Sequence, residues 1–260
     1  MATEVVAVIP AHLASVRFPR KILHDFYGLP MIEHVRRRAL LSQSISKVIV
    51  ATCDDQIEDV ISGYGGEVIR TSREHKNGTS RVAEAIKSIE TSHVLLLQGD
   101  EPLLLPNHVD LMARSIFDNP GGNAWNATAK LEFAEELDRH SFVKCVVAES
   151  GRILMCFRRT PFFAPFAEQQ RFVRKILGLI AYRKDFLLSL VLINPGVCEV
   201  AESIEQLRII ENNFDIQSVC VDPSLPSVNE PHEEGIVRRY LESNPLQVSL
   251  LQQVLSWNKA

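Results

Sequence analysis

Residues 5–23 read VVAVIPAHLASVRFPRKIL, an apolar run that passes directly into a loop with three cations. The consecutive apolar residues at 5–9 predict a strand that is buried on both faces of a parallel sheet. Arg17, Arg20 and Lys21 follow it, and cations in such a position can bind phosphate at the carboxyl end of the sheet. The stretch therefore predicts an α/β protein that handles a nucleotide.

A second apolar run has an acidic end. Residues 94–102 read VLLLQGDEP, so that Gly99 is followed by the adjacent carboxylates of Asp100 and Glu101. Mg²⁺ keeps several of its waters and binds few protein ligands, often one or two carboxylates beside substrate phosphates. The two stretches together indicate metal-assisted phosphoryl or nucleotidyl transfer, although Asp100 taken alone could be a loop-capping residue.

The first half of the chain alternates between strand-length apolar runs and amphipathic segments. Repeating βα units of this length predict a mainly parallel sheet with helices on both faces. The predicted strands are residues 5–10, 47–52, 67–70 and 93–98, and the predicted helices are near residues 31–42, 54–64, 79–88 and 106–119.

The second half of the chain is less regular. Residues 142–148 and 152–157 flank a glycine-containing turn at 149–151, which predicts a β-hairpin. The aromatic, proline-interrupted segment 162–172 is interpreted as a loop or lid. Strands are predicted at 176–182 and 216–221, and helices at 203–212 and 233–242, the last of which would close the domain. We expect one domain over residues 1–260, with a substrate or dimerisation lobe around 140–200.

The composition narrows the class of protein. A formal net charge of −4 over 260 residues argues against nonspecific nucleic-acid binding as the main function. No apolar run approaches the roughly 20 residues that span a bilayer. We therefore expect no membrane insertion, and we expect a cytoplasmic location. The cysteines are scattered and odd in number, which is typical of reduced, largely buried thiols: Cys53, Cys145, Cys156, Cys198 and Cys220.

The order and spacing of short motifs resemble the 3-deoxy-manno-octulosonate cytidylyltransferases, or CMP-Kdo synthetases, of the nucleotide-diphospho-sugar transferase superfamily. Each motif is weak alone, but the series extends from about residue 5 to residue 240. The motifs are IPA at 9–11, RFPRKIL at 17–23, GLPMI at 28–32, VAT at 50–52, GTSR at 78–81, QGDEP at 98–102, VK at 143–144, AYR at 181–183 and IEQLR at 204–208.

The resemblance implies a fold, a reaction and a cofactor. The fold would be Rossmann-like, with a mainly parallel mixed sheet and a smaller lobe. The protein would couple CTP to a 2-keto-3-deoxy sugar acid, with Mg²⁺ as cofactor and commonly as a homodimer. The anomeric hydroxyl of the sugar would attack the α-phosphorus in line, while metal and cations neutralise the leaving pyrophosphate.

The resemblance also implies roles for individual residues. Taken alone, Arg17, Lys21 and Arg81 could be solvated surface charges, and Glu205 and Gln206 polar residues of a helix face. In the family context, Arg17, Lys21 and Asp100 would be catalytic. The nucleotide would be held by Ala11, His12, Ser15, Arg17, Lys21, Thr79 and Arg81, the metal by Asp100 and Asn229, and the acceptor by Gln98, Tyr182, Glu205, Gln206 and one of Arg158 and Arg159, between which the resemblance does not decide.

Three departures from the family pattern affect these roles. His12 replaces a usual arginine, so some affinity for phosphate is expected to be lost. Ile176 lies in KILG where the family has RHLG, which predicts a changed acceptor pocket. Asn229 lies in SVNEP where the family has GVDTP, and a neutral amide there predicts weaker metal binding unless Glu230 or the substrate compensates.

Three hypotheses of function follow. The first is an active cytidylyltransferase for Kdo or a close relative. The second is the same chemistry on another acidic acceptor, such as an amino sugar acid or a phosphonate, motivated by Ile176 and the aromatic residues in 162–166. The third is a weakened paralogue that binds nucleotide or a partner protein without turnover, motivated by His12, Ile176 and Asn229.

Overall fold

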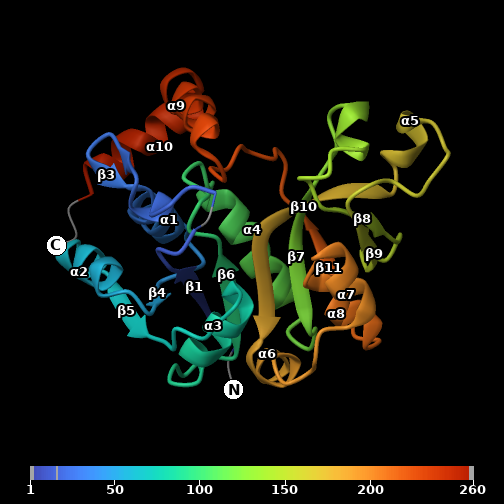
Figure 1. The fold of residues 1–260 in the computed structure, drawn as a ribbon, viewed down its shortest axis with the longest axis horizontal. Coiled ribbons are helices and arrows are strands. Elements are labelled where there is room, and N and C mark those ends of the chain that lie inside the picture. The colour runs from blue at the N-terminus through green and yellow to red at the C-terminus, as the bar shows by residue number, and fades with distance from the viewer. Residues whose placement is uncertain (1–2, 16, 258–260) are drawn as a thin grey trace. The chain divides into compact units, whose positions relative to one another are not determined.

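The computed structural model describes residues 3–15 and 17–257. These residues form two compact units (Figure 1). The first unit comprises the described residues of Met1–Ala113 and Leu225–Ala260, and the second unit is Arg114–Ser224. The lobe that we expected around residues 140–200 falls inside the second unit.

The first unit is built on four parallel strands, as the alternating pattern predicted. In the order β6, β1, β4, β5 they are His93–Leu97, Val5–Ala11, Val48–Thr52 and Glu67–Arg70. All three pairings are parallel, and β1 lies between β4 and β6 (Figure 1). Because parallel strands share one carboxyl edge, the loops that follow β1 and β6 leave the sheet on the same side.

Six helices of the described chain begin in the first unit. The four helices predicted between residues 31 and 119 are confirmed within two residues at each end. They are α1 (Met31–Leu40), α2 (Asp55–Gly63), α3 (Gly78–Ile86) and α4 (Pro106–Asp118), and α9 (Glu234–Ser243) and α10 (Pro245–Leu255) follow near the C-terminus.

Helix α10 corrects the prediction that a helix at 233–242 closes the domain. The Asn244 side chain accepts hydrogen bonds from the backbone N–H groups of Leu246 and Gln247, both at 3.1 Å. Pro245 occupies the first turn, where its missing N–H costs nothing. This Asn-Pro start is a local N-terminal signal, so the second helix could have been found from the sequence.

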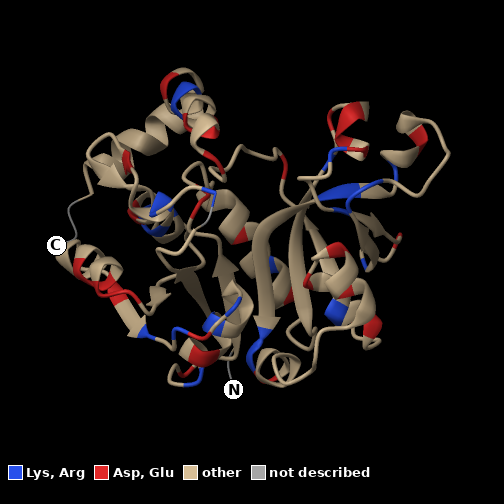
Figure 2. Cartoon of the chain, in the orientation of Figure 1, with Lys and Arg blue, Asp and Glu red and all other residues tan. Residues whose placement is uncertain are grey.

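Helix α1 buries charged side chains. Glu33 is fully buried and accepts hydrogen bonds from Arg36 at 2.6 Å and from Arg37 at 2.7 Å. Arg38 is also fully buried, and burial lowers its pKa to about 10. The Arg38 guanidinium donates to the Gln247 Oε1 atom of α10 at 2.8 Å. In Figure 2 this basic stretch is the blue part of α1 within the first unit.

The second unit contains five strands. They are β7 (Ala124–Ala129), β8 (Lys144–Val147), β9 (Ile153–Phe157), β10 (Val173–Arg183) and β11 (Ile216–Cys220). Strand β7 pairs antiparallel with β10 and parallel with β11, while β8 pairs antiparallel with both β9 and β10. The antiparallel pairing of β8 with β9 confirms the predicted hairpin. Its turn contains Gly151, whose φ of 83° favours glycine. The strand β7 was not predicted.

Short helices complete the second unit. The segment 162–172, interpreted as a loop or lid, contains the helix α5 (Phe166–Gln169). Three of its aromatic residues, Phe162, Phe166 and Phe172, pack against the small buried cluster of Leu131, Leu137, Phe157 and Val173. The other helices are α6 (Lys184–Leu190), α7 (Val197–Glu202) and α8 (Gln206–Glu211), of which only α8 was predicted.

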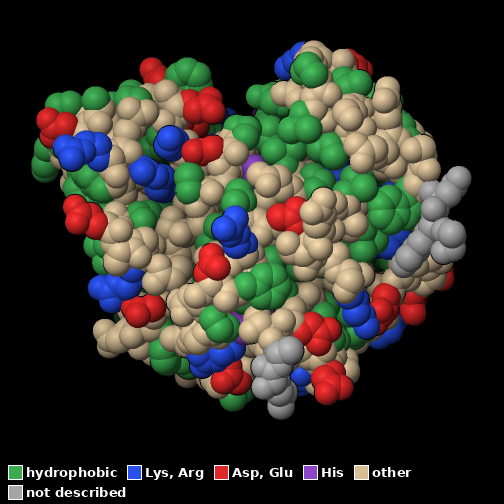
Figure 3. Space-filling model, turned by 180° about the vertical axis from the view of Figure 1, so that it is seen from behind, with side chains coloured by type: hydrophobic (Ala, Val, Ile, Leu, Met, Phe, Trp, Pro, Cys, Tyr) green, Lys and Arg blue, Asp and Glu red, His purple; other side chains and the backbone are tan. Residues whose placement is uncertain are grey.

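The surface and the thiols agree with the composition. Acidic and basic side chains are interspersed on the face shown in Figure 3. All five cysteines are free; Cys53, Cys145 and Cys156 are buried, whereas Cys198 and Cys220 are exposed. Within the described ranges, no helix has the length and apolar character needed to cross a membrane.

Replacing Gln247 by Ala should destabilise the first unit. The change removes one of the two acceptors of the buried Arg38 guanidinium and the donor that reaches Leu103 O at 2.9 Å. We expect a loss of about 2 kcal/mol in the free energy of unfolding, because a buried charged donor loses a partner. Urea denaturation measures this loss. Gln253→Ala, an exposed position of the same helix, is the matched control, and an equal loss in both variants would contradict the role given to Gln247.

Candidate active site

The loop after β1 is anchored at its start. Ala11, the last residue of β1, is buried, and His12 beyond it is exposed. The Leu13 N–H donates to the Asp54 carboxylate at 2.9 Å, just before α2 begins. Ser15 N donates back to Leu13 O at 2.9 Å, which curls the loop. The loop is therefore held against the carboxyl end of β4 before it reaches Arg17, whose side chain is exposed.

Three segments that are distant in sequence meet at Lys21. The Lys21 ammonium forms an ion pair with the Asp100 carboxylate, and it also donates to Val228 O at 3.3 Å. The backbone closes the arrangement, because Val228 N donates to Asp100 O at 3.0 Å. The side chains of Lys21 and Asp100 are 14% and 20% exposed, so both charges remain accessible to a ligand. Gln98, half-buried, directly follows β6 and precedes this loop.

Asn229 lies immediately after this meeting point. Its side-chain nitrogen donates to Ser227 Oγ at 2.9 Å, and its backbone N–H donates to Glu233 at 2.6 Å. The amide nitrogen is thus engaged, and the amide oxygen is the atom that could bind a cation. Val228 is hydrogen-bonded through its backbone to both Lys21 and Asp100, and Asn229 is the residue that follows it.

The His12 residue is exposed, but its imidazole is partly desolvated, and this lowers its pKa; the positive charge of Arg81 lowers it further. The carboxylate of Asp54 acts in the opposite direction. The imidazole is therefore largely neutral at pH 7, and it does not supply the full positive charge of the arginine expected at this position. The loss of phosphate affinity at this position stays a prediction.

Arg81 is buried, so its interpretation as an exposed helix cation is wrong. Its guanidinium donates to Thr71 Oγ1 at 2.6 Å and to Ser72 O at 3.2 Å. Thr79, on the first turn of the same helix, is also buried. The start of α3 approaches β1 closely, since a Cβ atom on Gly78 would lie 2.9 Å from Pro10. The end of β1 and the beginning of α3 are therefore packed directly against each other.

Mg²⁺ prefers oxygen ligands and keeps several of its waters. Within residues 3–15 and 17–257, no three His, Cys, Asp or Glu side chains converge on a possible metal position. One accessible carboxylate, an amide oxygen and a strand-end loop do fit a Mg²⁺ ion that is held mainly by substrate phosphates. The donor set thus fits a nucleotide-bound metal better than an ion held by protein alone.

In the second unit, Arg158 and Arg159 differ in their partners. The Arg158 guanidinium donates to three backbone carbonyls, those of Glu202, His140 and Ser203, at 2.8, 3.0 and 3.1 Å. Arg159 is exposed and has no hydrogen-bond or ion-pair partner among the described residues. Of the two arginines, Arg159 is therefore the one available to an anionic ligand.

The other residues expected at the acceptor lie on β10 and at the start of α8. Tyr182 is buried in β10, and Glu205 directly precedes Gln206, the first residue of α8. The Gln206 side-chain nitrogen donates to Asn126 Oδ1 at 2.9 Å. Asn126 in turn donates to Leu177 O at 3.0 Å, where the pairing of β10 with β7 is irregular.

Asn126 was missed in the sequence. It is fully buried in β7 and links Gln206 to the irregular part of β10, the stretch that contains Ile176. A single asparagine in an unrecognised strand has no motif around it. Its role depends on partners 51 and 80 residues away, so local sequence offered no signal for it.

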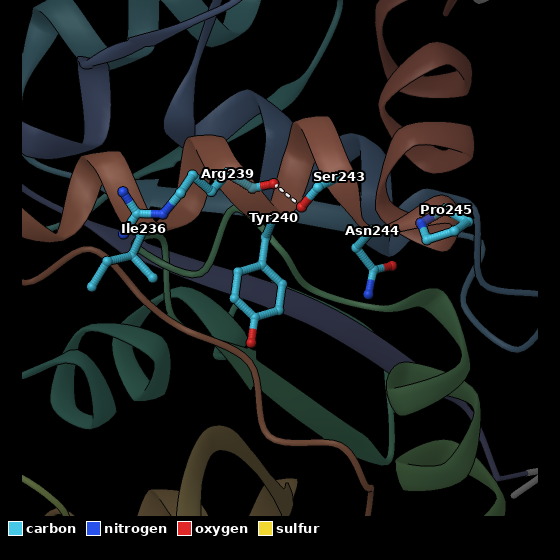
Figure 4. Close-up of a pocket in the computed structure, with 6 residues that line it drawn as sticks. All are labelled: Ile236, Arg239, Tyr240, Ser243, Asn244 and Pro245. Atoms are coloured by element: carbon cyan, nitrogen blue, oxygen red, sulfur yellow. Dashed lines mark hydrogen bonds between the residues drawn. The ribbon is translucent and has the colours of Figure 1, made fainter.

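A surface pocket of about 440 Å³ lies along α9 and the start of α10 (Figure 4). Its lining residues are Ile236, Arg239, Tyr240, Ser243, Asn244 and Pro245. The Ser243 hydroxyl donates to Arg239 O at 2.6 Å, which is the bond drawn in Figure 4. None of the residues expected to bind nucleotide, metal or acceptor lines this pocket.

Comparisons with known proteins agree with the motifs. The family model described as cytidylyltransferase matches residues 6–216. The 3-deoxy-manno-octulosonate cytidylyltransferase of Chlorobium phaeobacteroides is 36% identical, covering 94% of this chain and 100% of its own. Its namesake in Chlorobium limicola is 39% identical, with coverages of 91% and 96%.

A solved structure gives the same result. CMP:2-keto-3-deoxy-manno-octonic acid synthetase, complexed with CTP, superposes with a TM-score of 0.87 at 33% identity, covering 92% of this chain and 99% of that one. The expected Rossmann-like nucleotidyltransferase fold is thereby confirmed. The chain belongs to the 3-deoxy-manno-octulosonate cytidylyltransferase family.

Proposed function

We propose that this protein transfers a CMP group from CTP to 3-deoxy-manno-octulosonate (Kdo) or a close relative, with release of pyrophosphate. The observation that carries the proposal is the meeting of Lys21 and Asp100, which lie in the segments that follow β1 and β6, where a triphosphate and its metal would bind. The Kdo-specific names of relatives that match along nearly the whole chain support the choice of acceptor.

The reaction asks for charge neutralisation more than for covalent chemistry by the protein. The anomeric hydroxyl of the acceptor attacks the α-phosphorus, its proton is lost, and the bond to the pyrophosphate oxygen breaks. Arg17 and Lys21 stabilise the negative charge on the triphosphate. Asp100 and the Asn229 amide oxygen would hold Mg²⁺, which supplies further neutralisation of phosphate charge when it is bound.

The proposed acceptor contacts are polar atoms of the second unit that can still form hydrogen bonds to a ligand. Arg159 presents an exposed guanidinium, which suits bidentate binding of a sugar carboxylate. The Gln206 nitrogen is engaged with Asn126, so its carbonyl oxygen would accept a hydrogen bond from a sugar hydroxyl. We include Tyr182 and Glu205 in this contact set on the family resemblance, and we extend the proposal to a homodimer.

Pyrophosphate release tests the proposal directly. The purified protein is incubated with Mg²⁺, each nucleoside triphosphate in turn, and Kdo or a panel of amino sugar acids and phosphonates. We expect release only with CTP and Kdo. Release with another acid alone would favour the second hypothesis, and CTP binding without release would favour a weakened paralogue. Absence of CTP binding would overturn all three, and light scattering checks the dimer.

Asp100→Asn should abolish most turnover. The substitution keeps the size of the side chain and removes the charge that faces Lys21 and the proposed metal. We expect kcat/KM to fall by at least about 100-fold, because the metal contributes several kcal/mol of charge stabilisation. The melting temperature should fall only modestly, because the Lys21 ammonium loses its carboxylate partner but keeps its hydrogen bond to Val228 O. Asp118→Asn, at an exposed residue of α4, should retain full activity; retained activity in Asp100→Asn would exclude its assigned role.

Asn229→Asp should lower the Mg²⁺ concentration required for half-maximal activity. A carboxylate adds a negative charge at the position where the amide oxygen is available. Ser227 Oγ can donate to the new carboxylate, so the local bond at 2.9 Å need not be lost. A Mg²⁺ titration of the rate measures the effect, with Asn212→Asp at an exposed residue as control. An unchanged requirement would place residue 229 outside the metal site.

A further inference from the structure

Arg158 ends one helix and connects two segments of the second unit. The last carbonyls of a helix have no intrahelical partner, and α7 ends at Glu202. Arg158 Nε donates to Glu202 O at 2.8 Å and Nη2 donates to Ser203 O at 3.1 Å. Its third nitrogen, Nη1, donates to His140 O at 3.0 Å. Every nitrogen of the guanidinium is therefore engaged with a carbonyl of the same unit.

The turn held by Arg158 leads directly to residues expected at the acceptor. Ser203 adopts a left-handed conformation with a φ of 54°, which is uncommon for a residue with a side chain. Glu205 and Gln206 follow at the start of α8, a helix that packs against β9 (Figure 1). Because Arg158 binds both carbonyls before this start, it restrains the direction in which Glu205 and Gln206 enter the helix.

The backbone on both sides of Arg159 is held as well. Lys144 of β8 is fully buried, and its ammonium donates to the carbonyl oxygen of Arg158. It also donates to Arg139 O and Phe142 O, each at 2.9 Å. On the other side, Thr160 N donates to Leu137 O at 3.3 Å. Arg159 therefore projects from a backbone that is fixed at the residue before it and at the residue after it.

We propose that Arg158 is a positioning residue: it holds Arg159 and the Glu205–Gln206 helix start in the relative arrangement that an acidic acceptor requires, and does not bind the acceptor itself. This inference rests on the proposed function for the identity of the acceptor. The brace itself, which is the set of bonds from Arg158 to Glu202, Ser203 and His140, does not depend on it.

The test compares Arg158→Ala and Arg158→Lys with the matched control Arg152→Ala. Arg152 lies in the turn before β9 and pairs with Asp215 in an exposed salt bridge. In Arg158→Ala we expect the KM for the acceptor to rise by about tenfold, from the loss of charge-assisted hydrogen bonds. The KM for CTP should change by less than about twofold, because no bond of Arg158 reaches the described nucleotide residues. Arg158→Lys should be intermediate, and the control unchanged.

Amide hydrogen exchange provides a readout that needs no turnover. Residues 203–207 should exchange faster in Arg158→Ala than in wild type, and at the wild-type rate in Arg152→Ala and Arg159→Ala. Arg159→Ala should weaken acceptor binding without this change in exchange. If Arg158→Ala does not fold, Arg158→Lys carries both measurements.

The outcomes separate the inference from the proposed function. An unchanged acceptor KM in Arg158→Ala, or an equal rise in the KM for CTP, would overturn the positioning role. A raised acceptor KM with unchanged exchange at 203–207 would show that Arg158 contacts the acceptor directly, which would also overturn it. Absence of CTP-dependent turnover in wild type would refute the proposed function, while the exchange measurement would still decide whether the brace exists.

Discussion

The ion pair between Lys21 and Asp100 is the constraint on which the first unit depends. A partly buried ammonium and a partly buried carboxylate each require a partner, since either charge left alone would be costly. Their pairing, together with the Val228 backbone, joins three segments that are far apart in the sequence. A triphosphate and a divalent cation offer each charge a new partner of opposite sign. Under the proposed function, the pair would hold these segments together without ligand and exchange its contacts when substrate binds.

The loop that carries Asp100 is supported from behind by buried polar groups. Gln247 of α10 donates to Leu103 O, and Arg38 of α1 donates to Leu104 O at 3.2 Å. Both side chains are fully buried or nearly so, and they also bond to each other. Buried polar groups are costly unless they are satisfied, and in Arg38 only Nη1 makes such bonds, while Nε and Nη2 have no partner among the described residues. The C-terminal helix and the loop after β6 are therefore joined through Arg38 Nη1 and Gln247. Residues without chemistry of their own thereby stabilise the position of the carboxylate.

The sequence predicted those parts of the molecule that are encoded locally. Apolar runs that end in cations or carboxylates, such as the stretch before Asp100, predict a parallel sheet and also predict that ligands bind at its carboxyl edge. The sequence could not separate Arg158 from Arg159, because only tertiary contacts show that each guanidinium nitrogen of Arg158 donates to a carbonyl. Asn126 and the strand β7 were missed for the same reason, whereas α10 was missed although Asn244 and Pro245 marked its start.

In the second unit, two cations are held rigidly and keep the positive charge that would attract an acidic acceptor. The hydrogen-bond partners of Lys144 and Arg158 are backbone carbonyls, which fix these cations in place without removing their charge. Carboxylate partners would have given similar rigidity but would have cancelled the positive potential. Under the proposed function, only Arg159 would need to contact the acceptor directly. Lys144 and Arg158 would add positive potential and hold the backbone around Arg159 in place. Under the proposed function, recognition of an acid would rest on the exposed guanidinium of Arg159, positioned by the fully buried Lys144 and the half-buried Arg158.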